Sequence, residues 1–272
     1  KPDVWIQIAL PGEFTRRGKY NIGVTALIET TLCIYDWVDN CGKMDLVLVS
    51  SKHGQAVLEN SRAEYKGIFA LKGNSKPFQK SPVEILFEGI DLKKFYIPRS
   101  QSWFKELDSI LITDWNFLCM GQWLPGDYGE DRKNIGYTIG TFLDTFKDTK
   151  NAPGLVLKVN GLNDSEIDRY EIVNKIQIIQ DSIKYKESLP PIYLLHGELS
   201  DRSLNTLYND PRIKAMVSFT KGEGFGRSLM EFASLGKPVI CSGWSGPTDF
   251  LSTKHSAIVG GSLEYVHPSA SN

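Results

Sequence analysis

The sequence predicts an α/β protein built on doubly wound parallel sheets. Three observations support this prediction: apolar runs of strand length recur along the chain, amphipathic segments alternate with them, and a glycine-rich loop follows one of the strands. Strands that alternate with helices favour a parallel sheet with helical crossovers. In such sheets ligands bind at the loops that leave the carboxyl ends of the strands. The glycine-rich loop is therefore the first candidate for a binding site.

The first part of the chain has three apolar segments of strand length, at residues 4–10, 45–49 and 83–87. An amphipathic segment at 26–38 and a run at 54–61 predict helices between them. Residues 91–107 follow without clear periodicity and contain Pro98, which is typical of a linker. We therefore expect a first domain at residues 1–107, with the linker at about 91–107.

The second part repeats the alternation of strands and helices more regularly. The predicted helix at 135–146 carries apolar residues at positions i, i+4, i+7, i+8 and i+11, which is the spacing of a helix packed on a core. We expect residues 108–272 to form a second, Rossmann-like domain. Its predicted strands lie at 109–120, 155–159, 192–195 and 213–219, and its other predicted helices at 166–180, 204–208 and 228–235.

Composition and charge bound the class of protein. The chain of 272 residues is long enough for two modest domains, and its net charge of −1 gives no global attraction to nucleic acid or anionic lipid. No apolar run approaches the roughly 18 residues of a membrane span, and no signal peptide is recognisable. The chain begins with Lys1 rather than Met, which is compatible with a leader or a longer segment ahead of it.

The cysteines indicate a reducing compartment. The four of them are scattered, and Cys33, Cys119 and Cys241 have apolar sequence neighbours, which favours buried free thiols and a cytoplasmic location. Neither the cysteines nor the four histidines form the close pairs of a zinc site. We therefore expect no metal and no other cofactor.

The glycine-rich loop has the residues of a nucleotide-sugar site. Three glycines surround Glu223 and Phe225, and Glu231 lies about one turn into the helix that follows. Glycine lets backbone amides approach a ligand, and a helix N-terminus offers N–H groups to phosphate. Glu231 can reach a ribose hydroxyl pair, and Glu223 lies where a sugar ring would, although this spacing alone is a weak signal. The three glycines are Gly222, Gly224 and Gly226.

The whole string is more specific than its parts. Glu223-Gly-Phe-Gly, followed by Leu-Met-Glu231 and by Gly-Lys-Pro-Val-Ile at 236–240, resembles the Glu-x7-Glu signature of the retaining glycosyltransferases of the GT-B fold. In that family the first glutamate contacts the transferred sugar and the second contacts the nucleotide ribose. The resemblance implies that Glu223 is the catalytic residue and that Glu231 binds the donor. It further implies donor-binding backbone amides at Gly224, Phe225 and Gly226.

The resemblance also implies a GT-B-like fold of two Rossmann-type parallel-sheet domains, with the donor bound by the second. Stretches of the first part, such as Tyr20–Gly23, and the segment Leu86–Asp91 resemble the acceptor domain and the crossover between the domains. A family acceptor domain usually has several more strands than this chain provides. We therefore expect the N-terminal domain to be short or truncated.

A basic pair, Arg132-Lys133, precedes the predicted helix at 135–146. An arginine fork and a lysine point charge suit a diphosphate, although a charge run by itself is more typical of a solvated surface. The pair follows Leu118-Cys-Met-Gly-Gln-Trp123, which is similar to a family pattern that ends in Arg-Lys-Asn. The resemblance implies that Arg132 and Lys133 bind the donor diphosphate.

His196 and Gly197 follow the predicted strand at 192–195 and are candidates for the base pocket of the nucleotide. A histidine at the end of a strand is more often simply packed, so both interpretations of His196 stay open.

The resemblance implies a hexosyltransferase-like enzyme that moves a sugar from a UDP-, GDP- or ADP-sugar to an acceptor with retention of configuration. The sequence contains no Asp-x-Asp, so a metal-independent reaction is expected. A catalytically inactive nucleotide-sugar binding module would share the donor residues and is the alternative. A dehydrogenase is disfavoured because no Gly-x-Gly-x-x-Gly follows a strand. The acceptor (a glycan, lipid, protein or modified base) and the oligomeric state stay open.

Overall fold

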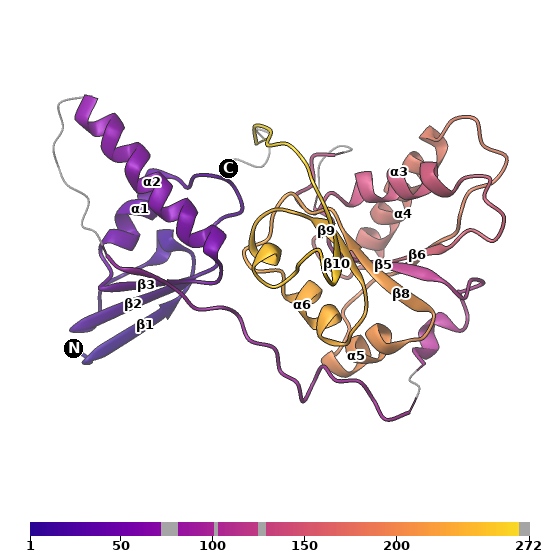
Figure 1. The fold of residues 1–272 in the computed structure, drawn as a ribbon, viewed down its shortest axis with the longest axis horizontal. Helices are drawn as coiled ribbons and strands as arrows, with labels where there is room; N and C mark the ends of the chain where they lie inside the picture. The colour runs from indigo at the N-terminus through magenta and orange to yellow at the C-terminus, as the bar shows by residue number, and fades with distance from the viewer. Residues whose placement is uncertain (72–80, 101–102, 125–128, 267–272) are drawn as a thin grey trace. The chain divides into compact units, whose positions relative to one another are not determined.

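The computed structural model describes residues 1–71, 81–100, 103–124 and 129–266. They form two compact units, each built on a parallel sheet (Figure 1). The first unit is assembled from three stretches of the chain, Lys1–Gly89, Gly222–Gly226 and Trp244–Phe250. The second unit contains Ile90–Lys221, Arg227–Gly243 and the residues from Leu251 onward.

The first unit has a four-stranded parallel sheet in the order β1-β2-β3-β4. Helices α1 (Tyr35–Gly42) and α2 (Lys52–Leu71) lie on one side of it (Figure 1). Because side chains alternate along a strand, Val47 and Val49 share one face of β3, where they are buried in a core with Val38 and Leu58 of the helices. The strands are β1 (Val4–Ile8), β2 (Tyr20–Thr25), β3 (Leu46–Val49) and β4 (Val83–Ile85).

The second unit has a six-stranded parallel sheet in the order β10-β9-β8-β5-β6-β7. The chain begins in the middle with β5, adds β6 and β7 on one side, and then adds β8, β9 and β10 on the other. The strand order therefore reverses between β5 and β8, and ligands of doubly wound sheets bind at such a switch point. The strands are β5 (Asn116–Gln122), β6 (Gly154–Asn160), β7 (Ile192–Leu195), β8 (Ile213–Ser218), β9 (Val239–Ser242) and β10 (Ser256–Val259).

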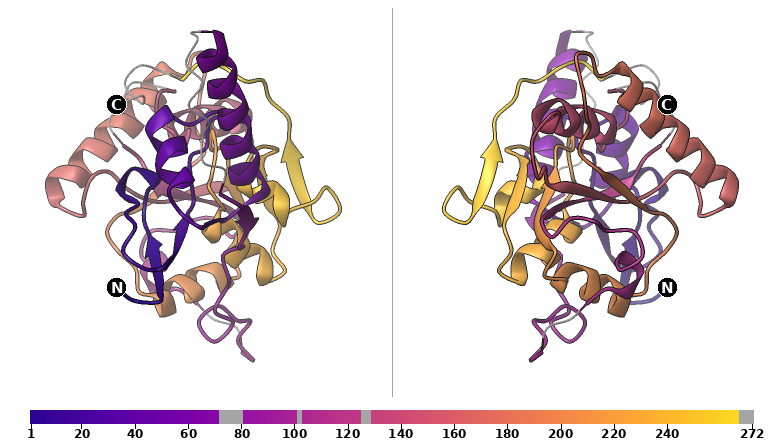
Figure 2. Two further views of the ribbon diagram at one scale, coloured as in Figure 1. Left: turned by 90° about the vertical axis from the view of Figure 1, so that its left-hand side faces the viewer. Right: turned by 90° about the vertical axis from the view of Figure 1, so that its right-hand side faces the viewer.

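Helices cover both faces of this second sheet. Helices α3 (Ile135–Phe146) and α4 (Glu166–Ser182) pack on one face, and α5 (Asp201–Asn209) and α6 (Arg227–Ser234) lie on the other (Figures 1 and 2). Leu155, Leu157 and Val159 of β6 are buried in the core with α3 and α4. Since side chains alternate along a strand, Lys158 and Asn160 belong to the opposite face of β6.

The predicted doubly wound sheet of the second unit is confirmed. The helix predicted at 135–146 and the strand predicted at 192–195 have the bounds of α3 and β7. The amphipathic segment at 26–38 does not form one helix, because α1 begins only at Tyr35.

Strand β2 was not predicted from hydrophobic periodicity, because its buried face carries Asn21, Gly23 and Thr25. The Asn21 side chain can be buried because it hydrogen-bonds Gly18 and Asp45. Gly23 leaves no room for a side chain, since a Cβ there would lie 2.5 Å from the Phe14 ring. A polar face of this kind gives no period of two in hydrophobicity.

The two units divide after Gly89, whereas the expected boundary lies at 107/108. The expected linker, of which residues 101–102 lie outside the described part, belongs to the second unit. Phe104 and Leu107 of this segment are buried, and the backbone N–H of Phe104 donates to Asp210 Oδ2 at 2.8 Å. The segment is thus part of the packing of the second unit.

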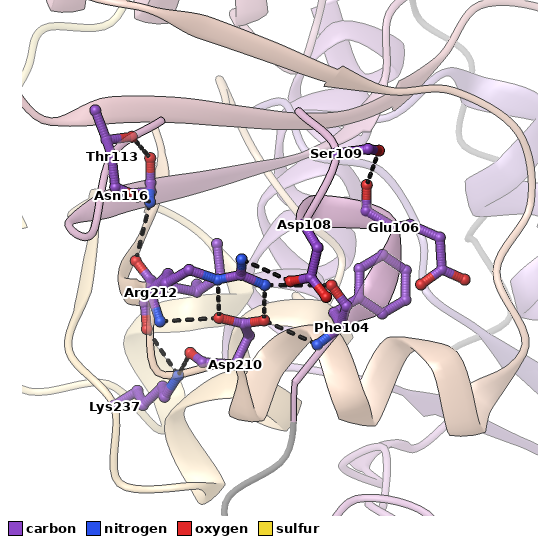
Figure 3. Close-up of polar contacts among 10 residues, drawn as sticks. Phe104, Glu106, Asp108, Ser109, Thr113, Asn116, Asp210, Arg212 and Lys237 are labelled. Atoms are coloured by element: carbon purple, nitrogen blue, oxygen red, sulfur yellow. Dashed lines mark hydrogen bonds and ion pairs between the residues drawn. The ribbon is translucent and has the colours of Figure 1, made fainter. Parts of the chain in front are cut away.

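A charged cluster fixes this segment (Figure 3). Arg212 pairs with Asp210 at 2.7 Å and with Asp108 at 2.8 Å, and its guanidinium lies 4.9 Å from the centre of the Trp103 ring. Lys237 Nζ donates to the backbone oxygens of Asp210 and Ile213 at 2.8 and 2.7 Å. Ion pairs of this kind leave no trace in hydrophobic periodicity, which is why the boundary could not be predicted from it.

Candidate functional site

The loops that leave β5 and β8 meet at the switch point of the second sheet. The backbone oxygen of Arg132, in the first loop, accepts hydrogen bonds from Lys221 N at 2.9 Å and from Thr220 Oγ1 at 3.3 Å, both after β8. Lys221 Nζ also hydrogen-bonds the backbone oxygen of Gly129. The structure therefore brings the predicted basic pair next to the start of the glycine-rich segment.

The predicted diphosphate ligands lie at the entrance to α3. The Arg132 side chain is exposed, and Lys133 is half-buried with its stem against Gly121, where a Cβ would lie 3.1 Å from Lys133 Cγ. The carboxylate of Asp131 is buried and accepts the N–H of Ile135 at 2.8 Å, which caps the helix. The loop is thus ordered by its own acid, while two cations follow it at the carboxyl end of β5.

Glu231 lies on α6 and is 7% exposed. Its Oε2 accepts a hydrogen bond from the Tyr208 hydroxyl at 3.3 Å, and Arg227 Nε lies 3.6 Å from its Oε1. Burial raises the pKa of the Glu231 carboxyl, and the Arg227 charge opposes this shift. A buried carboxylate with few partners has acceptor capacity left for hydroxyl groups.

The glycine-rich loop is packed closely within the first unit. A Cβ at Gly222 would lie 2.4 Å from the Glu29 side chain, and a Cβ at Gly224 would lie 2.9 Å from that of Ala26. Gly226 has a φ of +97°, which L side chains rarely adopt. Glycines are therefore required here by packing and backbone conformation, besides any approach of a ligand.

The backbone of Glu223 is held by the loop that follows β9. Glu223 N donates to Ser245 Oγ at 2.9 Å, and Gly246 N donates to the backbone oxygen of Glu223 at 3.0 Å. Ser50 Oγ donates to the backbone oxygen of Gly224 at 3.1 Å. Phe225 is buried, with its ring centre 5.2 Å from that of Phe250. The position of Glu223 is thus fixed by the backbone on both sides of it.

His196 is a packed residue at the end of β7. Its Nε2 lies 2.9 Å from Asp168 Oδ2, and both side chains are buried. The Asp168 carboxylate also accepts the N–H groups of Gly161 and Leu162 at 2.7 and 2.8 Å. Burial alone would raise the pKa of Asp168, but the hydrogen bonds from His196 and the backbone hold it below its usual range. The pair ties β7 to the loop between β6 and α4.

A pocket of about 520 Å³ opens at the carboxyl ends of β5 and β6. Gly197, the second residue of the predicted base pocket, reaches it indirectly through a hydrogen bond from its N–H to Asn160 Oδ1 at 3.2 Å. Lys158 and Asn160 were not predicted from the sequence, because they lie in an apolar strand run. A lysine inside such a run was the available signal. The lining residues are Met120–Gln122, Lys158, Asn160–Asp164 and Glu198.

Three features bear on the class of protein. Within the described ranges, no group of three His, Cys, Asp or Glu side chains is placed to hold a metal ion. In the same part of the chain, no helix is both long and apolar enough to cross a membrane. The four cysteines are buried and free.

No family model and no curated protein matches the sequence. Solved structures do match. HepE of Anabaena, in complex with UDP and glucose, aligns at 13% identity and a TM-score of 0.55, over 89% of this chain and 58% of that one. A trehalose-6-phosphate synthase studied for glycosyl transfer with retention aligns at 13% identity and a TM-score of 0.59, over 88% of this chain and 56% of that one. The UDP-forming α,α-trehalose-phosphate synthase of Burkholderia xenovorans, in complex with glucose-6-phosphate, aligns at 10% identity and a TM-score of 0.61. The alignment covers 89% of this chain and 56% of that one.

These similarities confirm the predicted fold class. The chain has a GT-B-like fold of two parallel-sheet α/β units, the fold of these glycosyltransferases. It spans a little more than half the length of each of these three structures. At identities of 10–13% the likeness is one of fold.

Proposed function

We propose that the chain belongs to a retaining glycosyltransferase that moves a hexose-type sugar from a nucleoside-diphosphate sugar to an acceptor. The observation that carries the proposal is the junction at the switch point, where the backbone oxygen of Arg132 accepts a hydrogen bond from the N–H of Lys221 at 2.9 Å. The loop with the basic pair meets there the end of the loop after β8, two residues before the Glu-x7-Glu segment begins, at the edge of the sheet where such folds bind ligands. The GT-B-like fold supports the same function.

In this proposal Arg132 and Lys133 bind the donor diphosphate and stabilise the negative charge that grows on it as the sugar leaves. The backbone amides of Phe225 and Gly226 contribute donors to the same phosphates. Glu231 accepts hydrogen bonds from the ribose hydroxyls. Positive groups in place before the reaction need no reorganisation when charge develops, which lowers the barrier.

Glu223 is proposed to orient the sugar. Its backbone is held on both sides, by Ser245 Oγ and by Gly246 N, so the carboxylate starts from a fixed position. Retention is proposed to follow from attack on the face that the phosphate leaves, with the leaving phosphate accepting the proton of the acceptor hydroxyl. No metal ion is assigned a part in this scheme, and the buried thiols are consistent with the cytoplasm as its location.

An inactive nucleotide-sugar binding module is the second candidate. Such a module would use the same donor-binding residues without turnover. Release of nucleoside diphosphate from a donor sugar, with or without acceptor, separates the two candidates.

A thermal-shift panel tests the donor site. UDP, GDP, ADP, their glucose and mannose conjugates and NAD are added to the parent, to Glu231→Ala and to Glu64→Ala, an exposed glutamate of α2. Ligand at about 100 times its Kd stabilises by roughly 2.7 kcal/mol, which raises the Tm of a chain this size by about 5 °C. We expect one nucleotide to raise the Tm of the parent and of Glu64→Ala but not of Glu231→Ala. Stabilisation by NAD alone would refute the proposal.

A further inference from the structure

The pocket at the ends of β5 and β6 has a floor and a rim of different chemistry. Lys158 and Asn160 at its floor are half-buried, whereas the charged rim residues Asp164 and Glu198 are exposed. None of these four takes part in the donor site as proposed above. The pocket lies wholly within the second unit.

Lys158 is half-buried between two strand positions that carry apolar residues. In the parallel register Lys158 lies between Met120 of β5 and Leu195 of β7. Among the described residues no carboxylate lies within 4.0 Å of it, and its one hydrogen bond goes to Asn160 Oδ1 at 3.2 Å. Burial lowers the pKa of Lys158, and the more distant charge of Glu198 opposes the shift. A half-buried cation without an acid is stabilised by any anion that reaches it.

Asn160 presents donors to the same pocket. Its Oδ1 accepts from both Lys158 Nζ and Gly197 N, each at 3.2 Å, which fixes which end of the amide is oxygen. The Nδ2 group is therefore oriented away from these partners and hydrogen-bonds nothing else within the described ranges. Two remaining ammonium hydrogens and an amide NH₂ make the floor rich in donors. Such a floor suits a ligand that only accepts hydrogen bonds.

We propose that Lys158 and Asn160 form a phosphate-binding subsite. The inference rests on the proposed function, in which this subsite holds a phosphate of the nucleotide-sugar donor. The pocket adjoins the predicted diphosphate ligands, because its wall residue Gly121 is the one against which the Lys133 stem packs. The rim carboxylates are exposed, so solvent and salt screen their repulsion of an anion.

Calorimetric titration of the full chain tests the subsite. The probes are UDP, GDP, ADP, inorganic pyrophosphate and glucose 6-phosphate, and the variants are Lys158→Gln, Lys158→Met, Lys158→Arg and Glu231→Ala. Lys214→Gln is the matched control, since Lys214 is an exposed lysine near the start of β8, at the opposite edge of the sheet from the pocket. The Tm of each variant without ligand is measured first. Lys158→Met keeps the apolar stem of the side chain and replaces Lys158→Gln in the titrations if the glutamine variant is unstable.

Because Lys158→Gln loses a charge-assisted hydrogen bond, its affinities for pyrophosphate and for nucleoside diphosphate should both fall by roughly 10- to 100-fold. Lys158→Arg should restore most of the affinity, and Lys214→Gln should match the parent. Glu231→Ala should weaken nucleoside diphosphate but not pyrophosphate. If Lys158→Gln binds glucose 6-phosphate more weakly than the parent but binds nucleoside diphosphate equally well, the donor assignment is overturned. The subsite would then hold a phosphorylated acceptor.

The two proposals fail in different ways. Unchanged affinity of Lys158→Gln and Lys158→Met for every phosphorylated probe would overturn the subsite, while loss of nucleotide binding in Glu231→Ala would still support the transferase. If no nucleoside diphosphate binds the parent, the transferase proposal fails. Pyrophosphate binding that depends on Lys158 would then still support the anion subsite, and absence of pyrophosphate binding would overturn it.

Discussion

Glu231 is a buried carboxylate, and the ribose contact that we propose for it would require its charge. Its side chain is 7% exposed, and its hydrogen bond from Tyr208 is long, at 3.3 Å. The ion pair with Arg227 spans 3.6 Å and its arginine is mostly exposed, so it contributes little to stability. The charge is therefore held at a cost in stability, which the proposed ligand contact of Glu231 would explain.

Glu231→Gln should separate these two effects. Because burial raises the carboxyl pKa, the native state binds more protons here than the unfolded chain, and stability falls as pH rises through the interval between the two pKa values. We expect the variant to melt about 1–3 °C above the parent at pH 8, and the difference to vanish at about pH 4, where both states are protonated. Differential scanning calorimetry measures it. A variant that melts below the parent at pH 8 would contradict this account.

At the scale of the element, the glycine-rich loop is a packed segment. Gly224 has the Ala26 backbone oxygen 3.1 Å from the place of a Cβ, and Gly246 has Phe225 Cα at 2.6 Å. Neither contact is evident from the sequence, where these partners lie far apart or in another loop. The packing of the first unit therefore requires glycines in this loop, whether or not a ligand binds there.

Gly224→Ala should destabilise the first unit by about 1–3 kcal/mol, because the new methyl group overlaps Ala26. Gly67→Ala is the control: it lies in α2 with no atom within 4 Å of a Cβ, and alanine there should stabilise by about 0.5–1 kcal/mol. Urea unfolding followed by circular dichroism measures both. Equal stability of the two variants would show that the loop yields to the added methyl group.

The cluster around Arg212 fixes the segment before β5 to the second unit (Figure 3). Lys237 completes it, with its ammonium bonded to two backbone oxygens and its pKa lowered by burial to about 8. The unfolded value is 10.5, so between about pH 8 and 10.5 the unfolded chain binds more protons than the native state. The contribution of Lys237 to stability therefore rises with pH in this interval.

Lys237→Met should destabilise by about 1–2 kcal/mol at pH 7, since two buried carbonyl groups lose their donor. The difference in unfolding free energy from the parent should widen between about pH 8 and 10.5, because only the parent titrates there. Urea titrations at several pH values measure this, with Lys254→Gln, at an exposed lysine of the same unit, as the control. A difference that narrows as pH rises would refute the assignment of the low pKa to Lys237.

At the scale of the whole molecule, the four free thiols report on both units. Burial raises the pKa of Cys41 and Cys119 to about 12 and that of Cys241 to about 11, and it raises that of Cys33. The thiolate is the reactive form, so native thiols should be inert.

A thiol-reactive disulfide reagent at pH 8 should label none of the four cysteines in the native chain during the time in which all four react in denaturant. Because Cys33 and Cys41 belong to the first unit and Cys119 and Cys241 to the second, partial unfolding should expose the thiols in pairs. Rapid labelling of any one in the absence of denaturant would show that its unit opens locally.

The sequence by itself determined the alternation of strands and helices and the doubly wound parallel sheet of the second unit. These follow from hydrophobic periods of 2 and 3.6 residues, which neighbouring positions encode. The GT-B-like fold class was predicted from the resemblance of local motifs instead. The basic pair and the Glu-x7-Glu segment were likewise visible, since each is a local string.

Only the tertiary structure decided where the units divide, why glycines stand at 222 and 224, that His196 is paired with Asp168, and that Lys158 lies in a pocket. Each of these depends on partners that are distant in sequence: Ala26 lies nearly 200 positions from Gly224. Contacts of that separation are set by how parallel strands stack across crossovers, and no local pattern records which side chains they bring together.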